Sequence, residues 1–100
     1  MSGHIPPDKL RALAQICSEF MGVSAATQRE RLRRGFEHFP SLSTVEIRQG
    51  LDIIHPAGRV QELRDEGATI HTLWTTVVSD NGASHRVANY LWVREAQYAA

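Results

Sequence analysis

The sequence predicts an α+β fold in which helices come first and a β-hairpin comes last. Ser43 followed by Glu46 is the capping-box pattern that starts a helix. Pro56 suits the first position of the next helix, and Gly67 suits the residue just after its end. From residue 69 the chain is rich in β-branched and aromatic residues, which favour strands.

Residues 1–26 are predicted to form an N-terminal arm and one accessory helix. Asp8 is the expected N-cap of this helix, after Pro6-Pro7. Apolar residues recur at helical spacing on one face. They are Leu10, Leu13, Ala14, Cys17, Phe20 and Met21. This apolar face is expected to be buried against another surface. That surface is either the rest of the same protein or a second copy, in a homodimer that forms through the N-terminal helix.

A second helix is expected over residues 27–38, because Thr27 and Glu30 form another capping box and Pro40 ends the segment. Its apolar side holds Leu32 and Phe36. The rest of its surface is basic, with Arg29, Arg31, Arg33 and Arg34. Such a run favours a solvated helix face over a dedicated phosphate contact.

The next helix is expected to begin at Thr44 and to end at Gly50, after which His55 is the N-cap of a helix over residues 55–66. One side of that last helix, with Ala57, Val60 and Leu63, is expected in the core. The opposite side carries His55, Gly58, Arg59, Glu62 and Glu66. Two short helices joined by a tight turn are typical of a helix-turn-helix.

Two strand-like segments, residues 69–78 and 85–93, flank Asn81-Gly82, a strong hairpin signal. A brief extended segment is expected at Ser41-Leu42. A β-hairpin directly after a helix-turn-helix is the layout of a winged helix. The expected fold is therefore a winged helix-turn-helix over residues 27–94, with a three-helix core and a β-hairpin wing. The extra N-terminal helix precedes it, and a C-terminal tail, residues 95–100, follows.

The charges of the 100 residues sum to zero, with 11 Lys and Arg against 11 Asp and Glu. The chain as a whole therefore has no net attraction to a phosphate backbone. The cations are concentrated between residues 27 and 64, and ten of the 11 are arginine, the side chain best suited to guanine and phosphate. This balance is compatible with DNA contact but does not demand it.

No apolar run is long enough to cross a bilayer, and the N-terminus lacks the layout of a signal peptide. We therefore expect a cytoplasmic protein, associated with the nucleoid of a bacterial host.

The single Cys17 excludes an internal disulfide and a cysteine-based zinc site, and it suits a small core residue. The histidines lack zinc-ligand spacing, so no metal is expected. No residues combine into a catalytic set, so we expect no enzyme and no cofactor.

The segment IIHPAGRVQELRDEGATI, residues 53–70, resembles a family of small helix-turn-helix domains common in bacteriophage and prophage genomes. The matching residues are Leu51, Ile53, Pro56, Arg59, Val60, Glu62, Leu63, Arg64, Gly67 and Ile70. Asp52 stands where the family pattern usually has glycine. The likeness extends from about Thr27 to about Val93, and it implies a winged helix and DNA binding.

The candidate site is the helix over residues 55–66, expected to enter the major groove. Arg59 is the candidate for guanine, Gln61 for adenine and Glu62 for a cytosine amine. Gly58 either allows close approach to DNA or is simply tolerated on an exposed face, and Arg64 suits a structural role or a phosphate contact. Further candidates are His55 and Arg48. At or near the tip of the wing, Asn81, Ser84, His85 and Arg86 are candidates for a contact to the minor groove or backbone, and the alternative is a plain solvated hairpin.

The sequence thus predicts a sequence-specific double-stranded DNA-binding protein. We expect a transcriptional regulator or an excision-type accessory factor of a phage or mobile element. The alternative is a winged-helix module that docks on another protein, which fits the zero net charge and the acidic Glu62 and Glu66 on the presented helix. Salt separates the two, because DNA binding weakens steeply with salt and a complex with an apolar core does not.

Overall fold

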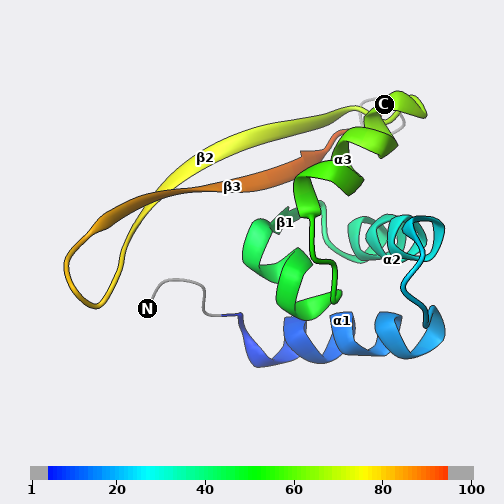
Figure 1. Cartoon of the computed structure of the whole chain (residues 1–100), viewed down its shortest axis with the longest axis horizontal. Helices are drawn as coiled ribbons and strands as arrows, with labels where there is room; N and C mark the ends of the chain where they lie inside the picture. The colour runs from blue at the N-terminus through cyan, green and yellow to red at the C-terminus, as the bar shows by residue number, and fades with distance from the viewer. Residues whose placement is uncertain (1–4, 95–100) are drawn as a thin grey trace, which may run out of the picture.

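The computed structural model describes residues 5–94, and the C-terminal tail expected at 95–100 lies outside the described residues. In chain order the elements are α1 (Pro7–Glu19), α2 (Ala25–His38), β1 (Ser41–Ser43), η1 (Glu46–Gly50), α3 (Pro56–Asp65), β2 (Ile70–Val78) and β3 (Ser84–Trp92). The helices pack together at one end, and the β2–β3 hairpin extends away from them (Figure 1). The predicted α+β winged arrangement is confirmed.

The sheet is antiparallel in the order β1-β3-β2. At the end of the sheet nearest the helices, one face of the sheet packs on them and buries Ile70, Ala88 and Tyr90. Trp92 meets Phe36 of α2 edge-on, with ring centroids 5.5 Å apart. The far half of the hairpin has no such cover among the described residues, so it forms a projecting wing (Figure 1).

The core is apolar and draws on every helix. Its buried members are Leu13, Ile16, Leu32, Phe36, Leu42, Ile47, Leu51, Ile53, Val60, Leu63, Ile70, Ala88 and Tyr90. The expectation for Ala57 is wrong, because that residue is exposed. The helix α3 begins at a buried Pro56, so its inner side runs through residues 56, 60 and 63 and turns position 57 outward.

The helix α1 packs on its own protein. Leu13 and Ile16 enter the core, whereas Leu10 stays 41% exposed. A Cβ on Gly50 would lie 2.4 Å from Leu13 Cδ1, so the close approach of α1 to η1 requires glycine there. Asp8 is not the cap, because the helix already begins at Pro7, the position where a proline loses no hydrogen bond.

The capping box of Ser43 and Glu46 is confirmed. Ser43 N donates to Glu46 Oε1 at 2.9 Å, and Glu46 N donates to Ser43 Oγ at 3.1 Å. The helical segment that follows is wider than expected, since Leu51 N donates to Glu46 O at 3.3 Å, a bond of the π-helical i→i+5 type.

The expected cap of α2 is wrong by one turn. Ser24 Oγ accepts the Thr27 N–H at 3.1 Å, so Ser24 is the N-cap and the helix starts at Ala25. The second box fails because Glu30 bonds arginines of its own helix instead.

The turn between η1 and α3 needs one left-handed residue, and Asp52 supplies it with φ +53°. Aspartate is among the few side chains that tolerate this region. His55 is the N-cap of α3, as predicted, although its side chain makes no capping bond. Gly67, with φ +109°, follows the end of α3, which confirms its place there.

Arg31 does not lie on a solvated face. It is only 3% exposed and donates to four backbone carbonyl groups. Nε reaches Leu51 O at 2.8 Å, Nη1 reaches Phe20 O and Gly22 O at 2.8 Å each, and Nη2 reaches Asp52 O at 3.2 Å. One side chain therefore joins the α1–α2 loop to the turn that precedes α3.

Candidate nucleic-acid interface

A groove of about 460 Å³ lies between the start of α3, η1 and the inner face of the wing. The residues lining it are Thr44, Val45, Arg48, His55, Pro56, Ala57, Gly58, Trp74, Arg86, Val87, Ala88 and Tyr90. They include two arginines and no carboxylate. The first N–H groups of α3 also open here and add partial positive charge. The groove therefore suits an anion such as a phosphate backbone.

Trp74 and Arg86 form the wing side of the groove. Trp74 lies opposite Ala88 in the sheet, so Arg86, two residues away on the same face, is its diagonal neighbour. The Arg86 guanidinium lies 4.6 Å from the centre of the Trp74 ring, a cation–π contact. Trp74 is still 58% exposed. Trp74 was not among the residues predicted from the sequence, although strand alternation on either side of Asn81-Gly82 places it on the same face as Arg86.

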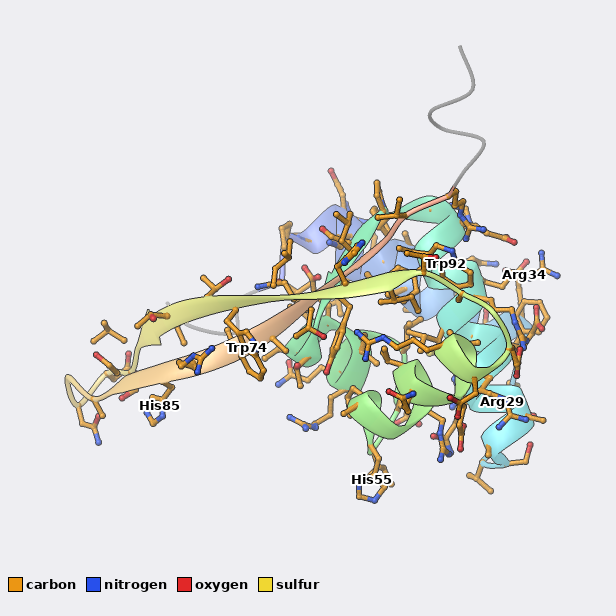
Figure 2. All side chains as sticks on the ribbon, turned by 90° about the horizontal axis from the view of Figure 1, so that it is seen from above. Arg29, Arg34, His55, Trp74, His85 and Trp92 are labelled. Atoms are coloured by element: carbon orange, nitrogen blue, oxygen red, sulfur yellow. The ribbon has the colours of Figure 1, made fainter. Side chains whose placement is uncertain are left out.

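The outward side of α3 is small and polar. Ala57, Gly58 and Gln61 are exposed, and His55 projects from the start of the helix (Figure 2). A Cβ on Gly58 would meet nothing closer than His55 Cβ at 3.9 Å, so internal packing does not require glycine. Gln61 Nε2 donates to Asp65 Oδ1 at 3.1 Å, one turn further on.

Arg59 and Glu62 contact each other on the side of α3 that faces α2. Arg59 Nε lies 2.9 Å from Glu62 Oε1, and Nη2 donates to Oε2 at 3.0 Å. Arg29 of α2 reaches the same carboxylate at 3.0 Å. In this arrangement neither Arg59 nor Glu62 is free to meet a base, so their roles in base recognition stay predictions that require the pair to open.

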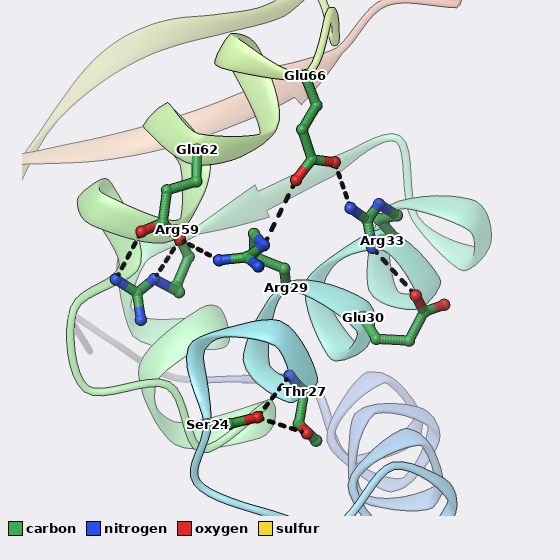
Figure 3. A network of polar contacts seen from close by, with 8 residues as sticks. All are labelled: Ser24, Thr27, Arg29, Glu30, Arg33, Arg59, Glu62 and Glu66. Carbon is green, nitrogen blue, oxygen red and sulfur yellow. Dashed lines mark hydrogen bonds and ion pairs between the residues drawn. The ribbon is translucent and has the colours of Figure 1, made fainter.

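The pair belongs to a network of alternating charges between α2 and α3 (Figure 3). Arg29 Nε lies 3.4 Å from Glu66, which also binds Arg33, and Arg33 in turn binds Glu30 at 3.0 Å. The hydrogen bond from Arg33 to Glu66 raises the pKa of that guanidinium. Each arginine on this flank is matched by a carboxylate, so the flank offers little charge to a phosphate.

Arg64 has a structural role. Its Nε and Nη2 donate to the Ile70 carbonyl at 2.9 and 2.6 Å, and Nη2 also donates to Thr72 Oγ1 at 2.9 Å. It thus ties the end of α3 to the start of β2, although no carboxylate takes part in these bonds.

The tip of the wing uses Asn81 for its own geometry. Asn81 Oδ1 accepts the Ala83 N–H at 3.1 Å, and Gly82 adopts φ +85° in the turn. Ser84 and His85 are exposed at the tip end of β3.

Arg29 and Arg34 lie far from this end of the molecule (Figure 2). The structure therefore gathers Arg48, His55 and Arg86 at one groove and separates them from the arginines of α2.

A larger hollow of about 640 Å³ lies elsewhere, between α2, the end of α3 and the start of β2. Arg33 and Arg94 line it together with Glu37 and Glu66, so its cations are matched by carboxylates, unlike those of the groove beside α3. Among residues 5–94, no cluster of three His, Cys, Asp or Glu side chains could hold a metal ion. No helix in that range combines the length and apolarity needed to span a membrane.

Comparison with known proteins agrees with this geometry. No curated protein matches the chain. A family model described as a winged helix-turn-helix domain matches residues 27–95, which contain α3 and both hairpin strands. Domains of this kind point to DNA as a partner. The model covers more than half of the chain, and the chain therefore belongs to the winged helix-turn-helix domain family.

Proposed function

We propose that this chain is a non-catalytic, sequence-specific double-stranded DNA-binding protein that regulates transcription, or assists excision, for a phage or mobile element. The supporting observation is the groove beside α3, which holds Arg48 and Arg86 and no carboxylate. The phage or mobile-element setting rests on the resemblance of residues 53–70 alone.

In the proposed complex, α3 lies in the major groove with Ala57, Gly58 and Gln61 toward the base edges. Gln61 can pair with adenine once it leaves Asp65. Arg48 and Arg86 lie in the groove beside the start of α3 and contact the phosphates that border the major groove. Arg59 can contact guanine only after its ion pair with Glu62 breaks. Glu62 therefore disfavours binding to sequences that offer no guanine to Arg59.

Selection from random duplexes at moderate salt tests this proposal. The selected site is then bound to Arg48→Ala, Arg86→Ala and Arg34→Ala. The first two should weaken binding several-fold for all duplexes, because phosphate contacts carry no sequence information. Arg34→Ala removes the same charge from a residue paired with Glu30 and Glu37, and it should change little. Equal losses in all three variants, or no enriched sequence, would contradict the proposed interface.

A second candidate function, docking on another protein, is favoured by Ile54, which is 69% exposed directly before α3. An apolar side chain at the presented end of a helix suits a protein surface better than phosphate. If this is the function, Ile54→Ser abolishes partner binding, and the affinity changes little between low and high salt.

A further inference from the structure

The strand β2 lies at an edge of the sheet, because the order is β1-β3-β2. Near its two ends, Val93 N donates to Thr69 O at 2.8 Å and Ser79 N donates to Ala83 O at 2.8 Å. Bonded and non-bonded pairs alternate in an antiparallel ladder, so the odd-numbered residues of β2 direct their N–H and C=O groups toward β3. The even-numbered residues direct theirs away from the sheet.

Arg64 covers only the beginning of this open edge, through its bonds to the Ile70 carbonyl and to Thr72 Oγ1. The outward backbone groups of Thr72, Trp74, Thr76 and Val78 lie beyond it. Over this stretch β2 forms the margin of the molecule, and no described helix or strand lies alongside its outer edge (Figure 1).

The open edge lacks the features that normally prevent pairing with another chain. The nine residues IHTLWTTVV contain no proline and no charged Asp, Glu, Lys or Arg. Trp74 and Val78 are 58% and 59% exposed. A long, uncharged edge with exposed apolar side chains is a template for another strand.

We propose that two copies of this chain pair along β2 as an antiparallel two-fold dimer with Thr75 on the axis. Trp74 then lies opposite the partner's Thr76, and Thr72 lies opposite the partner's Val78. These are hydrogen-bonded pairs, and together they form about eight backbone bonds. The result is a continuous sheet of the two hairpins and their β1 strands.

Charge and packing select this register. Asp80 falls beside the partner's Ile70, where the partner's Arg64 lies, so opposite charges meet at both ends of the paired strands. The two Trp74 side chains become diagonal neighbours on one face, within reach of each other. A slip by two residues in one direction moves Asp80 away from the partner's Ile70, and a slip in the other direction separates the two Trp74 side chains.

The dimer extends the proposed function, on which this step rests. Opposed residues in a sheet share a face, so both grooves open on the same side. The two Ile70 residues are ten positions apart along the strand direction, roughly 33 Å at about 3.3 Å per residue. This is close to one turn of DNA, so the two copies of α3 would meet successive major grooves. The preferred site is then two-fold symmetric, with half-sites about 10 base pairs apart.

Light scattering without DNA, from micromolar to millimolar protein, tests the dimer. Thr76→Pro removes an outward N–H and leaves every β2–β3 bond intact, whereas Thr76→Ala keeps that N–H. The natural chain and Thr76→Ala should dimerise, and Thr76→Pro should be monomeric with an unchanged circular dichroism spectrum. A monomeric natural chain at millimolar concentration would overturn the proposal. So would a folded Thr76→Pro dimer, the result expected if α1 formed the interface.

Cross-linking tests the register even if the proline variant fails to fold. In a Cys17→Ser background, Thr75→Cys places two sulfurs across the axis, in a non-bonded pair with Cα atoms about 4.5 Å apart. Oxidation should give a covalent dimer. Thr76→Cys in the same background faces the partner's Trp74 and should stay uncrosslinked. Absence of the first product, or equal yields of both, would overturn the pairing.

The two proposals fail separately. If the chain dimerises but binds no duplex selectively, DNA recognition is refuted and the β2 interface stands. If the natural chain is monomeric and protects a single half-site, the interface is refuted and DNA recognition stands.

Discussion

Arg31 differs from the other arginines of α2 because its guanidinium is buried and donates only to backbone carbonyl groups. Its neighbours Arg33 and Arg34 are paired with carboxylates near solvent. Burial of an arginine is favourable only where its donors are satisfied, and here all three nitrogens are. Arg31 is therefore a fold-determining residue, although it has the chemistry of a phosphate ligand.

Replacing Arg31 with alanine should lower the free energy of unfolding by about 3 kcal/mol, because buried carbonyl groups lose their donors. Urea denaturation followed by circular dichroism measures the change. Arg34→Ala serves as the control and should cost about 0.5 kcal/mol or less, as exposed ion pairs usually do. Similar losses in the two variants would mean that the Arg31 bonds add nothing beyond charge.

Replacing Gly58 with alanine separates stability from DNA binding. A Cβ fits at this exposed helical position, so the variant should gain about 1 kcal/mol of stability from the higher helix propensity of alanine. If α3 approaches the bases closely, the added methyl group should weaken specific DNA binding several-fold. Unfolding and duplex titration on the same preparation measure both. Unchanged affinity would favour the simpler explanation that glycine is only tolerated there.

Cys17 should react slowly with alkylating reagents in the folded protein. Burial raises the pKa of its thiol, nearby Asp52 adds to the rise and Arg31 opposes it. The thiol donates to the Gly50 carbonyl at 3.3 Å. A raised pKa means that the unfolded chain ionises first, so stability is fully present below the ordinary thiol pKa and falls as pH rises through it. Alkylation rates with and without urea, together with melting curves at alkaline pH, check both statements.

At the scale of the elements, α1 and η1 pack closely because Gly50 has no side chain. Gly50 faces Leu13, whose Cδ1, Cβ and Cγ lie 2.4, 3.1 and 3.3 Å from the position of an added Cβ. Movement of the Leu13 methyl groups alone would not relieve the clash with an added Cβ, since the Leu13 Cβ is also close. The accessory helix is thus fitted to the helix-turn-helix and shares its core.

A double-mutant cycle tests this fit. Gly50→Ala should lower the free energy of unfolding by about 1–3 kcal/mol through overpacking, and Leu13→Ala by about 2–5 kcal/mol through a cavity. The double variant should lose less than the sum, because each change relieves the other. Strict additivity in urea denaturation would show that α1 is not held against η1 in solution.

Over the whole molecule, zero net charge hides an uneven distribution. The arginines between α2 and α3 face carboxylates, whereas Arg48 and Arg86 stand in a groove whose lining has none. Overall charge therefore understates the attraction that one face has for DNA, because interaction at short range depends on local charge.

The salt dependence of DNA binding measures that local charge. Each phosphate contact contributes about 0.9 to the slope of log Kobs against log salt concentration. The double variant Arg48→Ala/Arg86→Ala should therefore lower the slope by about 2, whereas Arg34→Ala should leave it unchanged. An unaltered slope in the double variant would place the phosphate contacts on another face.

The sequence by itself determined the order and type of the elements. The Ser43–Glu46 box, Pro56 and Gly67 at the ends of α3, and Asn81-Gly82 between the strands all act over a few residues, so local rules suffice to predict them. The box expected at Thr27 and Glu30 was wrong, because Ser24 caps the helix and Glu30 bonds arginines of its own helix. The sequence also suggested Arg48, His55 and Arg86, but not that they share a groove.

Only the tertiary structure decided what each arginine does. Arg29 meets Glu62, 33 residues away, and Arg31 meets the turn after η1. Both lie on one helix and have the same chemistry, so no local pattern distinguishes the paired side chain from the buried one. The edge position of β2 likewise depends on the strand order. Contacts between distant segments fix burial and charge pairing, and these decide which cations stay available to a ligand.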